Sequence, residues 1–178
     1  MNSINANQPE DTHEDLVGTN AVTKIRELVA QAQTCFFCTV IVSGQSVKTR
    51  PMAAQEVDSQ GHLWFLGASD SVVVREIGQD PKVQLMFQGS PHSDFLTLYG
   101  HATLSRDKAK IDELWKPLMK TWFTEGKDDP RITVIQVAPA EGYYWDTKHN
   151  KVIVLAKMVA GMLIGKTLDD SIEGRIRV

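Results

Sequence analysis

The chain has 178 residues, 42% of them hydrophobic, which is enough for one buried core and short for two. Its 19 basic and 22 acidic residues give a net charge of -3, so no broad positive field exists for nucleic acid or an anionic membrane. No apolar run of about 18 residues could span a bilayer, and the first residues do not resemble a signal peptide. We therefore expect a cytoplasmic protein without a nucleic-acid or membrane partner.

A helix is predicted to open the folded part of the chain. Residues 1–19 are polar and lack apolar periodicity, so we expect a loosely ordered tail. Asn20 is a suitable N-cap, and Val22, Ile25 and Val29 follow it at helical spacing. The sequence therefore predicts a short amphipathic helix after Asn20.

The two cysteines, Cys35 and Cys38, form a CxxC within the strand-like run TCFFCTVIV. Alternation along a strand would put the thiols on opposite faces, and no second CxxC or CxxH completes a zinc site. We interpret them as buried strand residues, with a redox dithiol as the alternative.

Two successive hairpins are predicted next. CFFCTVIV is joined through a turn at 43–45 to SVKTRPMAAQEV, which is joined through a turn at 58–61 to HLWFLG. The three strands would form an antiparallel meander. Because proline cannot donate a ladder hydrogen bond, Pro51 indicates a bulge or an edge in the second strand.

Helices and strands then alternate irregularly. Residues 71–78 predict a short helix ended by Gly78 and Pro81, and KVQLMFQ and FLTLYGHATL predict two strands. SRDKAKIDELWKPLMKTWF predicts a longer helix, capped by Ser105 or Asp107 and kinked at Pro117. RITVIQVAPAEGYYWD is the last clear strand, and KVIVLAKMVAGMLIG fits either a strand or a helix.

Six strands with few helices and no βαβ alternation indicate a mainly β, α+β fold: a six-stranded antiparallel barrel with peripheral helices. The expected division of the chain is a flexible tail (1–19), one barrel domain (20–160) and a C-terminal extension (161–178).

The segment LWFLGASDS joins a strand to a helix start, where free backbone N–H groups attract anions. Ser69 and Ser71 could add hydroxyl donors and Arg75 a positive charge for a phosphate. The alternative is an ordinary helix cap beside a surface arginine.

Two further places could meet a ligand. An edge or bulge at Pro51 would leave backbone groups free beside the guanidinium of Arg50; the alternative is an edge-protecting proline next to an exposed arginine. Trp145 in GYYWD could lie against a ligand ring or pack in the core. The five histidines show no metal-binding spacing, and hydrolase, Rossmann and P-loop motifs are absent.

Six segments together resemble the general stress protein 26 branch of the pyridoxamine 5'-phosphate oxidase-like flavin-binding family. These segments are TRPM, LWFLGASDS, REIGQDPKVQL, LYGHATL, KIDELWKPLMKTWF and EGYYWD. The resemblance covers roughly residues 20 to 160, and it implies a split-barrel homodimer with FMN in two clefts at the subunit interface.

The resemblance also implies cofactor-binding positions. Arg50, Pro51 and Met52 would line the flavin, with the arginine near the ribityl phosphate. The segment Trp64, Phe65, Leu66 and Gly67 would run beside the flavin ring, Ser71 would contact the phosphate, and Trp145 would approach from the other subunit.

One position departs from the family pattern. The family often has Ser-Pro-Lys at this helix start, whereas this chain has Ser71, Val72 and Val73. Arg75 would have to reach back one turn to replace the lysine, or the ligand would be FAD. A lost charge-assisted phosphate contact costs about 1.5 to 3 kcal/mol.

The resulting hypothesis is an FMN-dependent oxidoreductase with a reduced nicotinamide or similar donor. No side chain is identified as a catalytic acid or base, so a flavin reservoir or stress-linked flavin-binding protein is the alternative. Oxidation of pyridoxamine 5'-phosphate itself is disfavoured, because the family's RxH substrate cluster is not found near the C-terminus.

Overall fold

The computed structural model describes residues 12–39, 44, 46–91, 93–147 and 171–178. The strands are β1 (Leu16–Val17), β2 (Thr34–Thr39), β3 (Lys48–Ala53), β4 (Glu56–Val57), β5 (Leu63–Ala68), β6 (Lys82–Gln88), β7 (Phe95–Ser105), β8 (Ile132–Thr147) and β9 (Ser171–Arg177). The helices are α1 (Thr19–Ala32), α2 (Val72–Gln79) and α3 (Lys108–Leu114), with 3₁₀ turns η2 (Pro117–Thr121) and η3 (Gly126–Asp128).

The sheet curls because of how its two free edges are connected. Its strands follow the order β1-β9-β8-β7-β6-β2-β3, and β5 pairs with β8 and with β4. β3 and β4 are therefore at opposite edges, yet Ala53 and Glu56 are only three residues apart in the chain, which spans at most about 11 Å. The edges must approach each other, and the result is a barrel with a split between β3 and β4.

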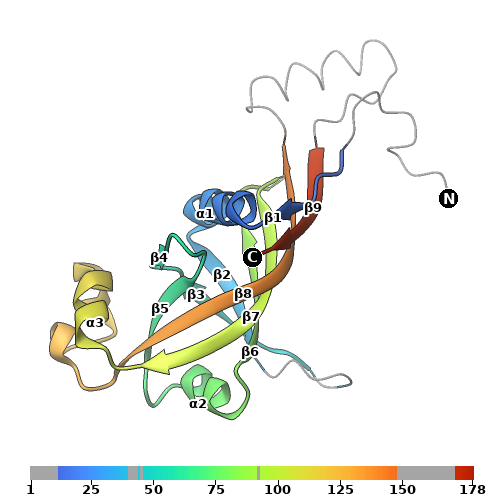
Figure 1. Cartoon of the computed structure of the whole chain (residues 1–178). Coiled ribbons are helices and arrows are strands. Elements are labelled where there is room, and N and C mark those ends of the chain that lie inside the picture. The colour runs from blue at the N-terminus through green and yellow to red at the C-terminus, as the bar shows by residue number, and fades with distance from the viewer. Residues whose placement is uncertain (1–11, 40–43, 45, 92, 148–170) are drawn as a thin grey trace.

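This architecture confirms the predicted mainly β, α+β split barrel with peripheral helices. The described residues contain nine strands instead of the expected six, because the short β1 and β4 and the later β9 add to the sheet. Pairing is antiparallel throughout the described sheet except between β1 and β9, which run parallel. Figure 1 shows α1 near one end of the barrel, α2 near the other, and α3 to the side of β5.

The barrel interior is filled by large side chains from facing strands. Phe37 of β2 and Phe65 of β5 are fully buried and meet edge to face, with ring centroids 5.3 Å apart. Ile25 and Leu28 of α1 cover this core from one side, and Ile77 of α2 belongs to the same cluster. The two helices therefore bury their apolar faces against the barrel.

A second, smaller core lies outside the barrel wall. Its buried members are Ile111, Leu114, Met119, Phe123, Ile132 and Val134. Trp64 and Leu66 of β5 pack against it, whereas Phe65 between them is in the barrel core. Strand alternation thus gives β5 two different buried faces.

The β2–β3 and β4–β5 hairpins were both predicted, but they do not form a continuous meander. The run 46–57 divides at Ala54 and Gln55, and β5 then pairs with β8 instead of extending the β2–β3 side. Pro51 lies in β3, which pairs only with β2 among the described strands, so the edge interpretation is confirmed. The predicted turn at 43–45 includes residues outside those described.

Helix boundaries differ from prediction at two places. α1 starts one residue before Asn20, after Gly18 in a positive-φ conformation (58°) that favours glycine, and it has no side-chain cap. α3 ends at Leu114 and does not continue through a kink: Trp115 and Lys116 are extended before Pro117. The proline ring disfavours helical geometry in the residue before it.

Other expectations are met more closely. α2 starts after Ser71 as predicted, but it runs through Gly78 and ends at Gln79. Cys35 and Cys38 are buried, unbridged strand residues. Cys35 belongs to the barrel core, and Cys38 lies 3.5 Å from the Thr49 hydroxyl of β3.

Both ends of the described chain join the sheet. Residues 171–177, which belong to the expected C-terminal extension (161–178), form β9 on β8, and Leu16–Val17 of the expected tail pair with β9. Residues 151–165, which fitted either a strand or a helix, lie outside the described residues. None of the helices in the described part is long and apolar enough to cross a membrane.

Candidate functional site

The corner between β5 and α2 presents backbone donors, as the sequence indicated. Ser71 caps the helix, its Oγ accepting from the Val74 N–H at 3.4 Å. Ser69 N–H donates to the Arg131 carbonyl at 2.7 Å. Among the described residues, the N–H groups of Val72 and Val73 in the first helical turn have no partner. The corner is thus partly capped by its own side chain and keeps two donors for an anion.

Arg50 points its guanidinium to the same helix. Its Nη2 lies 2.7 Å from Oε2 of Glu76 on α2, and its Nη1 donates to Thr39 Oγ1 at 3.0 Å. Thr39 Oγ1 also donates to the Glu76 carboxylate. The positive charge expected to meet a phosphate is therefore already paired with a carboxylate.

Glu76 is held in its ionised form by these contacts. Burial raises the pKa of the carboxyl, but the hydrogen bonds from Thr39 and Arg50 and the charge of Arg50 outweigh it. The net pKa of Glu76 lies below its ordinary value. An anion placed beside Arg50 would meet this negative charge, which no pattern in the sequence could locate.

Arg75 reaches back over the first turn of α2. Its Nη1 donates to the Asp70 carbonyl at 3.3 Å, and the side chain is exposed. Arg131 approaches the corner from the start of β8, but it is held by Asp129, with Nη2 to Oδ2 at 2.7 Å. Arg75 is exposed and forms no ion pair with a described carboxylate, whereas Arg50 and Arg131 each hold one.

The β5 segment predicted to run beside a flavin ring is largely covered within one chain. Phe65 is fully buried. Trp64 donates from Nε1 to Asp58 Oδ2 at 3.0 Å, and Lys110 Nζ lies 4.3 Å from its ring centroid. Leu66 packs on the second core. A Cβ added to Gly67 would approach Ile135 Cδ1 to 3.2 Å.

Met52 and Pro51 of β3 face opposite ways. Met52 packs against the barrel core and Pro51 is exposed. Pro51 is paired with Phe36, which is paired with Met86, and these side chains line a hollow of about 220 Å³. The structure therefore places Arg50 beside α2, and it places Pro51 on the outer face of the sheet.

Trp145 lies far from the corner in the same chain. Ala68, just before the corner, pairs with Ile132 at the start of β8, and Trp145 is 13 residues further along that strand. At about 3.3 Å per residue the path along the strand is about 40 Å, longer than one FMN. Trp145 is 43% exposed, and its ring centroid lies 4.6 Å from that of Tyr143. A single chain does not bring all the predicted residues together.

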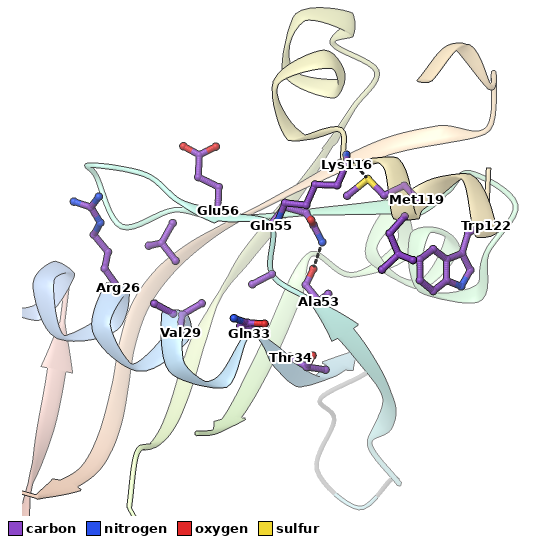
Figure 2. Close-up of a pocket in the computed structure, with 14 residues that line it drawn as sticks. Arg26, Val29, Gln33, Thr34, Ala53, Gln55, Glu56, Lys116, Met119 and Trp122 are labelled. Atoms are coloured by element: carbon purple, nitrogen blue, oxygen red, sulfur yellow. Dashed lines mark hydrogen bonds between the residues drawn. The ribbon is translucent and has the colours of Figure 1, made fainter. Parts of the chain in front are cut away.

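A hollow that the sequence did not indicate lies elsewhere, between α1, the β3–β4 junction and η2 (Figure 2). Its volume is about 610 Å³. The lining residues are Arg26, Val29, Ala30, Gln33, Thr34, Ala53, Ala54, Gln55, Glu56, Val57, Lys116, Leu118, Met119 and Trp122. None of them was predicted as a site residue. Four of them belong to the segment KIDELWKPLMKTWF, which was identified from the sequence only as part of a predicted helix and for its family resemblance.

The junction that forms the floor of this hollow is fixed by backbone hydrogen bonds. Ala54 N–H donates to the Gln33 carbonyl at 2.9 Å, and Gln55 N–H donates to the Trp64 carbonyl at 2.8 Å. The Gln55 side-chain amide donates to the Ala53 carbonyl, also at 2.9 Å (Figure 2). The hollow therefore lies on a segment between β3 and β4 whose backbone is held by hydrogen bonds.

Comparison with known proteins places the fold and the family. The chain is similar to Protein bli-3 of Neurospora crassa, 26% identical over 127 residues, which are 66% of this chain and 61% of that protein; the match thus spans less than two thirds of its relative. It is similar in structure to a general stress protein 26 from Jannaschia sp. CCS1 (TM-score 0.75, 20% identity, 88% of this chain and 97% of the other).

A second similar structure is the general stress FMN/FAD binding protein of Xanthomonas citri (TM-score 0.58, 24% identity, 68% of this chain and 84% of the other). At these identities the structural likenesses show a common fold. The family described as "Pyridoxamine 5'-phosphate oxidase like" matches residues 20–169, and the chain belongs to this family.

Proposed function

We propose that the chain binds a flavin, FMN in the first place and FAD as the alternative, and acts as an oxidoreductase of the general stress protein 26 type. Family membership supports flavin binding, and the similar Xanthomonas citri protein is named for binding FMN or FAD. The observation that carries the proposal is the β5–α2 corner, where the free N–H groups of Val72 and Val73 lie in the first turn capped by Ser71.

The phosphate of FMN would be the group held at this corner. Backbone donors at a helix start favour an anion, and Arg75, whose guanidinium hydrogen-bonds only the Asp70 carbonyl among the described residues, could add charge. Arg50 could contribute only by sharing its guanidinium between the phosphate and Glu76, or by leaving Glu76. FMN binding is therefore weakened by Glu76 and by the absence of the family's lysine.

The redox chemistry would come from the flavin, and the protein would position it and limit solvent access. Arg50, Pro51 and Met52 offer the edge strand β3 for contacts to the ring. We identify no side chain as a catalytic acid or base. A reduced nicotinamide is the donor we propose to test first.

We propose further that two copies of the chain form the complete site. Trp145 is about 40 Å from the corner along β8, so a second copy would have to supply it. The outer sheet face exposes Phe36 (58%), Met86 (39%) and Tyr99 (42%) as well as Trp145. Exposed apolar residues gathered on one sheet face favour a protein interface.

Flavin titration tests the proposal. The purified chain is titrated with FMN, FAD and riboflavin while flavin fluorescence is followed, and we expect FMN to bind more tightly than riboflavin. No quenching by any of the three would refute flavin binding. Equal affinity for FMN and riboflavin would refute the phosphate role of the corner.

Stopped-flow mixing of the flavin-loaded protein with NADH or NADPH then separates enzyme from reservoir. Bleaching of the flavin within seconds supports the oxidoreductase. A flavin that stays oxidised for minutes with both donors supports the reservoir function instead.

The second copy is tested by sedimentation. Met86→Lys on the outer sheet face should convert a dimer to a monomer, because a charge would be buried between the copies. Lys120→Glu on η2 also changes a charge, away from this face, and should leave the dimer intact. A wild-type chain that is monomeric with bound flavin would overturn the shared site.

A further inference from the structure

The hollow between α1, the β3–β4 junction and η2 has the size of a small-molecule site and is separate from the β5–α2 corner. About 610 Å³ is within the range of pockets that hold small organic ligands. None of the residues at the corner lines it, and Ala53, at its floor, directly follows Met52. The two places are thus neighbours along β3 but do not coincide.

The charges at the hollow are unbalanced in favour of a negative ligand. Glu56 is the acidic residue of the lining, and its carboxylate is paired with Lys110 Nζ at 2.8 Å. Arg26 from α1 and Lys116 before η2 form no ion pair with any described residue. Two cations without a described acidic partner at one hollow favour a negatively charged ligand there.

The η2 side of the hollow is apolar and exposed. Leu118 is 71% exposed and Trp122 is 64% exposed, although both are large hydrophobic side chains. Figure 2 shows Trp122 and Met119 on this side, with Arg26 and Val29 on the α1 side. An exposed indole beside an apolar surface is suited to cover the face of a ring.

The backbone that carries Trp122 is held in place. Its N–H donates to the Met119 carbonyl at 3.0 Å, and its own carbonyl accepts from Arg131 at 3.5 Å. Arg131 is in turn fixed by Asp129, whose side chain is fully buried. The exposed position of Trp122 is therefore maintained by the fold.

We propose that this hollow binds an organic anion with a planar apolar ring system. The ring lies against Trp122 and Leu118, and the anionic group lies within reach of Arg26 or Lys116. Binding itself does not need a flavin. Use of the bound anion as a redox substrate rests on the proposed function, because Ala53 adjoins the Met52 segment that would line the flavin.

Two matched fluorescent probes test the proposal. Anilinonaphthalene sulfonate carries a ring system and a negative charge, and phenylnaphthylamine carries a similar ring system without charge. We expect the doubly substituted R26Q/K116Q chain to bind the sulfonate about fivefold more weakly and the neutral probe unchanged, the size expected for exposed charge pairs. Trp122→Ala should weaken both probes.

Lys120→Gln is the matched control, because Lys120 lies on η2 but does not line the hollow. An equal loss in K120Q and R26Q/K116Q, or no loss in either, would overturn the proposal. A second result would also overturn it: the Trp122→Ala variant binds both probes as the wild type does but no longer self-associates. The exposed tryptophan would then be a contact between copies of the chain.

The titration is repeated with excess FMN to separate this site from the flavin site. Sulfonate binding that persists with FMN present supports a distinct site, and competitive displacement by FMN overturns it. If the chain binds no flavin at all, the probe results in the variants still decide the present proposal, so the two failures are distinguishable.

Discussion

Arg50 of the edge strand β3 and Glu76 of α2 are joined by an ion pair of 2.7 Å between Nη2 and Oε2. Both side chains are largely buried, at 22% and 14% exposure, and Thr39 of β2 hydrogen-bonds to both. The pair ties the helix that carries the proposed phosphate corner to the strand that carries the proposed flavin edge. It also places a carboxylate where a phosphate is expected.

Removal of this carboxylate should strengthen FMN binding. In Glu76→Gln the guanidinium of Arg50 is freed for the phosphate and a repulsive charge is lost, which we expect to raise FMN affinity about tenfold, equivalent to about 1.4 kcal/mol. Riboflavin affinity should not change, since it has no phosphate. Fluorescence titration measures both.

Glu27→Gln is the control for net charge, because Glu27 lies on α1 in an exposed pair with Lys24. A similar gain for FMN in E27Q would indicate a general charge effect. Weaker FMN binding in E76Q would mean that the ion pair positions Arg50 for the ligand.

The same pair should make the fold sensitive to acid. The folded pKa of Glu76 is below its ordinary value, so its contribution to stability is present above the unfolded pKa of about 4.3 and is lost as the pH falls through the folded pKa. Urea unfolding near pH 7 should show E76Q to be less stable than the wild type. The difference should shrink towards zero below about pH 4. A difference that is independent of pH would exclude the carboxylate as its cause.

Ser71→Ala should affect helix and ligand separately. Loss of the Oγ contact to the Val74 N–H removes the α2 cap, which costs about 1 kcal/mol of folding free energy. FMN should also lose more affinity than riboflavin, because the first turn that carries the free donors is less well fixed. Thermal unfolding and flavin titration report the two effects.

Ser69→Ala provides the comparison, because the Ser69 side chain makes no cap contact in α2. It should leave the melting temperature nearly unchanged. Equal destabilisation by the two substitutions would show that Ser71 does not act as a cap.

The hairpins and the edge strand could be predicted because their signals are local. Alternating apolar residues, turn residues and a proline at 51 are sufficient to define β2, β3 and β5 and to place Pro51 at an edge. The end of α3 was predictable in principle from Lys116 before Pro117, but helical spacing through Leu118 and Trp122 outweighed it. Periodicity alone does not show where a helix stops.

The candidate site was less accessible from sequence, because its contacts join distant segments. Glu76 was an unremarked residue of a short helix, and its effect on Arg50 arises from a contact across 26 positions. The hollow beside Trp122 combines α1, the β3–β4 junction and η2, which no linear motif links. β9 was missed because its pairing with β8 follows a long intervening segment.

The cysteine pair should be chemically inert in the folded protein. Burial, together with the nearby Cys38 thiol, raises the pKa of Cys35 to about 12, so almost no thiolate exists at neutral pH. We expect neither thiol of the native chain to react with dithionitrobenzoate over minutes, and both to react in denaturant. Rapid native reaction of either thiol, or a disulfide detected by mass, would support the redox-dithiol alternative.

Gly78 offers a stabilising change that leaves the corner untouched. It lies inside α2, is exposed, and a Cβ there would meet no atom within 4 Å. Gly78→Ala should therefore raise the free energy of unfolding by about 0.5 to 1 kcal/mol, because alanine loses less backbone entropy in a helix. Gly142→Ala in β8 is the opposite case, since its Cβ would collide with the Thr97 backbone, and it should destabilise the sheet.

FMN affinity unchanged in G78A would show that α2 already holds Ser71 and Glu76 in place. Destabilisation by G78A would mean that this last turn of α2 is not helical in solution.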